Sequence, residues 1–219
     1  MNQDDMKRAV AQAALKEIVP GAILGVGTGS TVNHLIDLLA DRVGDIPGAV
    51  SSSEASTRRL RAIGIPVLDL NEVDSIPVYI DGADEVTPEG FMTKGGGGAV
   101  TREKIVASAS DRFVCIVDES KVVETLGRFP IPVEVIPMAT SVVGRALRKL
   151  GGRPVKRGDF VTDNGNIILD IHDMRLESPG DFEIRINNIP GVVTCGVFAS
   201  TPSNLTIVSR SEGIRTIKP

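Results

Sequence analysis

The sequence predicts an α/β fold: a doubly wound, mostly parallel sheet with a smaller α+β domain inserted near the C-terminus. Two observations lead to this prediction. In the first half of the chain, short apolar runs of strand length alternate with stretches of helical period, which is typical of parallel sheets with helices on both faces. After residues 129–132 the pattern changes to polar-apolar alternation around a turn signal, which is typical of antiparallel strands.

The first half opens with an amphipathic helix, whose apolar residues recur at helical spacing between Met6 and Ile18 and which stops at Pro20 and Gly21. A short apolar run, 22–26, then leads through a glycine loop into a second helical stretch that ends near Leu39. The same alternation predicts further strands at 49–50, 65–68, 78–80 and 113–117, a helix that ends near Ile63, and a helix over 101–109.

In the second half we expect a strand at 133–136, a helix at 142–150, a hairpin around 163–166 with a strand at 167–171, a helix at 179–188, and a strand at 192–198. The run 205–208 is expected to rejoin the first sheet. This organisation predicts a Rossmann-like α/β catalytic domain of residues 1–128 plus 200–219 and a small α+β domain of residues 129–199.

The composition excludes several classes of protein. Hydrophobic residues make up 42% and charged residues 24% of the 219 residues, which is ordinary for a globular protein. A net charge of −4 argues against the basic surface that nucleic acids require. No apolar run approaches the roughly 20 residues of a membrane span, and the acidic start at Asp4 and Asp5 does not resemble a signal peptide. We therefore expect a cytoplasmic protein that binds neither nucleic acid nor membrane.

The loop 25–31, Gly-Val-Gly-Thr-Gly-Ser-Thr, combines backbone N–H groups at a helix start with hydroxyl side chains, an arrangement suited to a phosphate. It lacks the lysine of a Walker A loop, and Ser30 stands where a dinucleotide-binding loop needs its third glycine. Glu54 lies at about the right distance to bind a ribose hydroxyl, so a nicotinamide-dependent dehydrogenase stays open as an alternative. A plain turn, with Ser30 or Thr31 capping the helix, is the structural alternative.

Charged residues and glycines follow the predicted strand 78–80: Asp81-Gly82-Ala83-Asp84, then 94–98 (Lys-Gly-Gly-Gly-Gly) and Arg102-Glu103-Lys104. A strand that ends in carboxylates delivers them to the carboxyl edge of the sheet, where open α/β folds hold ligands. Glu103 falls in the first turn of a helix that Thr101 is expected to cap. Burial and nearby carboxylates would raise its pKa while Lys94 would lower it, a balance that suits a general base. A solvated acidic loop and a solvent-facing glutamate are the structural alternatives.

Residue types that are missing narrow the chemistry further. The histidines are His34 and His172, and Cys115 and Cys195 lie far apart within apolar runs, so neither a zinc site nor a Ser-His-Asp triad is indicated. Asp81 and Asp84 have the oxygen ligands that Mg²⁺ prefers, but the neighbouring lysine argues against a cation. We therefore expect acid-base chemistry on a small phosphorylated molecule, with no metal and no cofactor.

Six motifs, taken together and in this order, resemble the ribose-5-phosphate isomerase family of the A type: 25–31, 81–84, 94–97, 101–105, 132–137 and 161–166. The resemblance covers essentially the whole chain. It implies interconversion of D-ribose 5-phosphate and D-ribulose 5-phosphate through an enediol, in the non-oxidative branch of the pentose phosphate pathway, by a homodimer whose small-molecule partner is the sugar phosphate.

The resemblance also implies roles for single residues. Glu103 would be the base and Lys94 would stabilise the developing oxyanion, while Asp81, oriented by Asp84, would shuttle the hydroxyl proton. The implied substrate-binding residues are Thr28, Gly29, Ser30, Thr31, Asp81, Gly82, Ala83, Asp84, Lys94, Gly95, Gly96, Gly97, Lys121 and Lys7. A non-catalytic sugar-phosphate sensor would share the phosphate loop, but it should also carry a DNA-reading helix pair and a basic surface, and neither is visible in the sequence.

Overall fold

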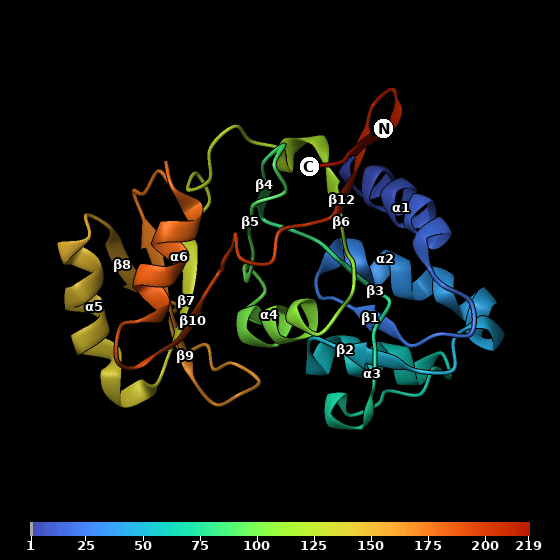
Figure 1. The fold of residues 1–219 in the computed structure, drawn as a ribbon, viewed down its shortest axis with the longest axis horizontal. Coiled ribbons are helices and arrows are strands. Elements are labelled where there is room, and N and C mark those ends of the chain that lie inside the picture. Colours follow the sequence, from blue (N-terminus) through green and yellow to red (C-terminus); the bar gives the residue numbers. More distant parts are fainter. Residues whose placement is uncertain (1) are drawn as a thin grey trace.

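The computed structural model describes residues 2–219 and contains three sheets (Figure 1). The largest has the strand order β13 (Gly213–Ile217), β12 (Leu205–Arg210), β6 (Phe113–Asp118), β3 (Val78–Asp81), β1 (Leu24–Val26) and β2 (Ala49–Ser51). Every neighbouring pair in it is parallel except β12 and β13. The predicted mostly parallel sheet is confirmed, and so is the return of residues 205–208 to it.

Helices cover both faces of this sheet because its strands alternate their side chains between two cores. Val78 and Ile80 of β3 pack into one core with α1 (Gln3–Ala14), α2 (Ser30–Leu39) and α3 (Glu54–Ala62), whereas Tyr79 belongs to a second core with α4 (Val100–Ser108). The sheet is therefore doubly wound, as predicted. No helix among residues 2–219 is long and apolar enough to cross a membrane.

A second, antiparallel sheet has the order β10 (Val192–Cys195), β7 (Ile131–Val135), β9 (Ile167–His172) and β8 (Arg153–Lys156). Together with α5 (Thr140–Lys149) and α6 (Pro179–Asn187) it encloses its own apolar core, and we call it the four-stranded unit. In Figure 1, α4 lies between this unit and the large sheet, and it contacts both β7 and β10. The division into domains at residues 129 and 199 stays a prediction, and Met1 lies outside the described residues.

A third sheet of β11 (Val197–Phe198), β5 (Met92–Thr93) and β4 (Glu85–Val86) joins the two larger ones. The single strand predicted at 192–198 is wrong, because the chain changes sheets at Gly196. Its N–H donates to the carbonyl of Pro132 and its carbonyl accepts from the N–H of Lys94. A Cβ on Gly196 would lie 2.2 Å from the Lys94 carbonyl oxygen, so the crossing requires glycine.

Two further local predictions are wrong. Residues 65–68 form no strand, since Val67 makes only an isolated bridge to Ala49. Thr101 does not cap α4, because the helix begins after Ala99 and the Thr101 hydroxyl donates instead to Glu134. Short 3-10 helices complete the chain: η1 (Leu15–Glu17), η2 (Ala40–Asp45), η3 (Leu70–Glu72), η4 (Glu119–Lys121) and η5 (Pro137–Ala139).

Candidate active site

The carboxyl ends of β1, β3 and β6 meet at one edge of the large sheet, where the order of the strands reverses around β1. A cavity of about 160 Å³ lies at this edge, between the loops that follow the three strands. It is lined by Gln3, Lys7, Thr28, Gly29, Ser30, Thr31, Gly82, Ala83, Asp84, Lys94, Gly95, Gly96, Gly97, Glu103, Val117, Asp118 and Lys121. All the residues predicted for the site therefore line this cavity, except Asp81.

Three lining residues were not predicted: Gln3, Val117 and Asp118. Asp118 ends β6 in the same way that Asp81 ends β3, so the signal of an apolar strand closing on a carboxylate was present for it. Its own carboxylate accepts the N–H and hydroxyl of Ser120, which shapes the turn towards Lys121. Nothing in the pattern of the first helix marks Gln3.

Asp81 lies directly beneath the cavity and is fully buried. Its Oδ1 accepts the backbone N–H of Thr28 at 2.9 Å and that of Gly82 at 2.7 Å. Its Oδ2 accepts the hydroxyl of Tyr79 and, at 2.8 Å, the ammonium of Lys94. A buried carboxylate with this many donors is held in one orientation. Asp81 therefore gives Lys94 a hydrogen-bond acceptor at a fixed position.

Glycines make room for the two aspartates. A Cβ on Gly27 would lie 1.9 Å from Cγ of Asp81, and a Cβ on Gly96 would lie 2.4 Å from Oδ1 of Asp84. Asp84 accepts the Gly96 N–H at 2.7 Å and faces the cavity; burial raises its pKa, and that hydrogen bond opposes the rise. Among the described residues no hydrogen bond joins Asp84 to Asp81, so the role of Asp84 in orienting Asp81 stays a prediction without a direct contact to support it.

Lys94 is the cation at the centre of the site and is only 2% exposed. Its Nζ donates to Asp81 at 2.8 Å, to the Gly82 carbonyl at 2.5 Å and to Oε1 of Glu103 at 3.2 Å. Burial alone would lower the pKa of Lys94, but the charges of Asp81 and Glu103 reverse this and raise it. The lysine therefore keeps its charge beside the cavity.

Glu103 points inward from the first turn of α4, because Val106 and Ala107 on the same helix pack into the core of the sheet. It is 5% exposed, and its Oε2 has no hydrogen-bond partner within residues 2–219. Burial raises the pKa of this carboxyl to about 8, against the opposing charge of Lys94. A carboxylate held with a free oxygen and a raised pKa at a cavity wall suits proton abstraction near neutral pH.

Another part of the lining, at the start of α2, is suited to an anion. α2 begins after Gly29, whose φ of 111° takes the chain into the helix and which has no side chain to cap it. Ser30 and Thr31 line the cavity at this helix start, where backbone N–H groups and the helix dipole favour negative charge. Lys7 from α1 and Lys121 from η4 add two positive side chains to the same cavity.

The structure gives no support to the dinucleotide alternative. The Glu54 carboxylate pairs with Arg102 at 2.8 Å on the surface, with its side chain 52% exposed, and it does not line the cavity. Cys115 and Cys195, which lie within apolar runs of the sequence, are buried and free. Among residues 2–219, no group of three or more His, Cys, Asp or Glu side chains could hold a metal ion.

Residues 48–213 match the family described as ribose 5-phosphate isomerase A (phosphoriboisomerase A). The chain belongs to this family. Solved members are similar over their full length: ribose 5 phosphate isomerase A from Neisseria gonorrhoeae is 46% identical with a TM-score of 0.98, covering 100% of this chain and 98% of that one. The enzyme from Methanocaldococcus jannaschii is 41% identical with a TM-score of 0.94, and each chain is fully covered.

A D-ribose-5-phosphate isomerase solved in complex with phospho-erythronic acid is 37% identical, with a TM-score of 0.96 and full coverage of both chains. As a phosphoriboisomerase A, the chain is an aldose-ketose isomerase of pentose phosphates. The family also accounts for the two features that the cavity combines, a carboxylate that can take a proton and a cradle that can hold a phosphate.

Proposed function

We propose that Glu103 is the base that interconverts D-ribose 5-phosphate and D-ribulose 5-phosphate. Its carboxylate removes the proton from C2 of the open-chain aldose, giving an enediol, and returns that proton to C1. The observation that supports this role most strongly is the buried, unpartnered Oε2 of Glu103 at the cavity wall. The raised pKa of the carboxyl makes it a stronger base than an exposed glutamate.

Lys94 stabilises the negative charge that develops on the substrate oxygen during this transfer. It is preorganised for the task, because Asp81 and the Gly82 carbonyl hold its ammonium in place before any substrate binds. Asp81 therefore contributes to catalysis by holding Lys94. A shuttle for the hydroxyl proton is assigned instead to Asp84, which lines the cavity and has a pKa raised by burial.

The phosphate lies at the start of α2, bound by Ser30 and Thr31 with Lys7 and Lys121 beside it. Thr28, Gly29, Gly82, Ala83 and the glycines 95–97 form the rest of the wall around the sugar. Binding energy from the phosphate then positions the reacting carbons against Glu103. Phospho-erythronic acid, bound by a related isomerase, combines a phosphate with a planar carboxylate that resembles an enediolate, which supports this placement.

The reaction would serve the non-oxidative pentose phosphate pathway in the cytoplasm, and the chain would act as a homodimer without metal or cofactor. Exposed apolar side chains on the four-stranded unit support self-association: Met138 is 93%, Ile184 57% and Val142 51% exposed. Sedimentation velocity should give twice the chain mass, and a single species of the chain mass would contradict the dimer.

A coupled assay with ribose 5-phosphate tests the reaction. Dialysis against a strong chelator should leave the rate unchanged, because Lys94 already supplies the positive charge next to the acidic groups. Activity lost on dialysis and restored by Mg²⁺ or Zn²⁺ would show that a metal ion is required.

A further inference from the structure

Glu103 is almost free of direct restraints, although a base must be held accurately. The one hydrogen bond to its carboxylate within residues 2–219 comes from Lys94 at 3.2 Å, and its Oε2 is unpartnered. Additional donors would fix the side chain, but each would favour the ionised form and weaken the base. Its position must therefore be set by the helix that carries it.

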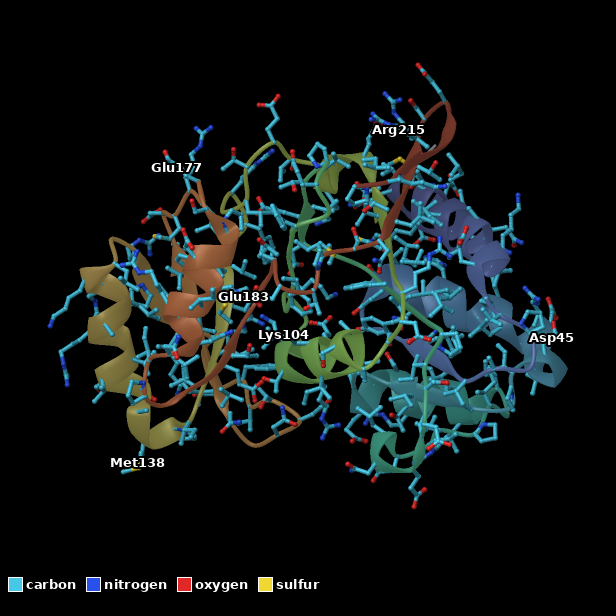
Figure 2. The ribbon with its side chains drawn as sticks, viewed as in Figure 1. Asp45, Lys104, Met138, Glu177, Glu183 and Arg215 are labelled. Atoms are coloured by element: carbon cyan, nitrogen blue, oxygen red, sulfur yellow. The ribbon has the colours of Figure 1, made fainter. Side chains whose placement is uncertain are left out.

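The residues on either side of Glu103 anchor α4 to the four-stranded unit. Thr101, two residues before it, donates its hydroxyl to Glu134 of β7. Lys104, the residue after it, extends to Glu183 of α6, as Figure 2 shows between the two helices. The neighbours of Glu103 thus bond away from the cavity, while Glu103 itself faces Lys94.

Glu134 is a fully buried carboxylate whose bonds fix it in one place. While its Oε2 accepts the Thr101 hydroxyl, its Oε1 accepts Thr162 at 2.8 Å, Asn166 at 2.9 Å and Asn164 at 3.1 Å. All the donors other than Thr101 come from the hairpin loop between β8 and β9. A buried charge satisfied by neutral donors in this way makes a rigid anchor for the start of α4.

The second anchor is Glu183, and both of its carboxylate oxygens are hydrogen-bonded as well. Lys104 donates to Glu183 and, at 2.6 Å, to the carbonyl of Val197 in β11. The other oxygen of Glu183 accepts the N–H of Ala199 at 3.0 Å and that of Ser200 at 2.8 Å, where the chain leaves the four-stranded unit. Glu183 is 3% exposed, so the ion pair is shielded from solvent and salt on its acidic side.

We propose that Glu134 and Glu183 are positioning residues for the isomerase reaction: through Thr101 and Lys104 they fix α4 against the four-stranded unit, and so they set the distance from Glu103 to the reacting carbon. The inference rests on the proposed role of Glu103 as the base. It gives the four-stranded unit a catalytic purpose, because a base displaced by about 1 Å can lose roughly 10²-fold in rate.

The test removes each anchor at the α4 end. Thr101→Val deletes the hydroxyl and keeps the shape, and Thr101→Ser restores it; Lys104→Met keeps the apolar stem and removes the charge. We expect kcat to fall about 10-fold in Thr101→Val and in Lys104→Met, and about 10²-fold in the double variant. KM should stay within about two-fold, because the phosphate cradle lies on α2, and Thr101→Ser should retain most of the wild-type kcat.

The pH profile separates positioning from a merely structural role. Loosening α4 admits water to Glu103, which lowers its pKa, so the acid limb of kcat/KM should move to lower pH by about one unit. Arg153→Gln is the matched control, because it breaks an exposed ion pair with Asp173 in the same unit, away from α4. It should leave kcat and the acid limb unchanged.

The outcomes distinguish the two proposals. Suppose that Thr101→Val and Lys104→Met leave kcat and the pH of the acid limb unchanged while Glu103→Gln is inactive. The assignment of Glu103 as the base is then supported, and the positioning role is overturned. If Glu103→Gln itself isomerises at the wild-type rate, the assignment of the base is overturned instead. Should Thr101→Val fail to fold, Lys104→Met alone decides, and an unchanged kcat in it overturns the inference.

Discussion

The raised pKa of Glu103 makes the stability of the fold depend on pH, and Glu103→Gln isolates this dependence. In the native state burial raises the pKa of the carboxyl from 4.5 to about 8. Between these values the native protein keeps a proton that the unfolded chain has released. The stabilisation from that proton is present at low pH and is lost as the pH rises through about 8.

Each pH unit in this window changes the free energy of unfolding by about 1.4 kcal/mol. Between about pH 6 and about pH 9 the wild type should therefore lose about 3 kcal/mol more than Glu103→Gln, whose amide does not titrate. The comparison cancels any effect of the substitution that is independent of pH. With a typical urea m-value of about 2 kcal/mol/M, the wild-type midpoint should fall by about 1.5 M relative to the variant.

The assay is urea unfolding of both proteins across this pH range. Two curves of free energy against pH that run parallel would show that the pKa of Glu103 is not raised, and the physical basis for its strength as a base would be lost. A lowered pKa would also give parallel curves here, because its effect on stability would fall below about pH 4.5; either way, parallel curves contradict a pKa raised by burial.

Two other substitutions test the rest of the site. Ser30→Ala and Thr31→Ala should raise KM and leave kcat nearly unchanged, because the hydroxyls contact the phosphate; a steep fall in kcat at constant KM would contradict that role. Lys94→Met should lower kcat by at least about 10²-fold, as expected when an oxyanion donor is removed. It should also lower the free energy of unfolding by about 3–5 kcal/mol, because Asp81 and Glu103 lose their buried partner. Near wild-type activity in Lys94→Met would exclude it as the oxyanion donor.

The large sheet was predictable from the sequence because each of its parallel strands is marked by a local pattern, a short apolar run. Apolar runs close on a glycine or a carboxylate at the site, with Gly27 after β1 and Asp81 at the end of β3, and parallel strands bring such ends together. The cavity lining followed from the same rule. Asp118 was missed although its signal was present, since it ends β6 in the same way.

Other features depend on contacts that no local pattern carries. The break at Gly196 comes from the approach of Lys94 and Pro132, which are distant in sequence. Thr101 looked like a helix cap, but the helix begins after Ala99, and the Thr101 hydroxyl donates instead to the buried Glu134 from a distant strand. The burial of Asp81 beneath the cavity likewise depends on the N–H of Thr28 and the ammonium of Lys94, which are distant from it in the sequence.

The most direct test of the account is the transfer of solvent deuterium into the sugar by the wild type and by Glu103→Gln. A base that takes the carbon-bound proton and exchanges it with water must introduce deuterium at the reacting carbon during turnover in D₂O. The account predicts this label with the wild type. With a folded Glu103→Gln protein it predicts no label, and kcat lower by at least about 10²-fold. A folded variant that still isomerises and labels the sugar at near the wild-type rate would contradict Glu103 as the base and point to Asp84, the other carboxylate whose pKa is raised at the cavity wall.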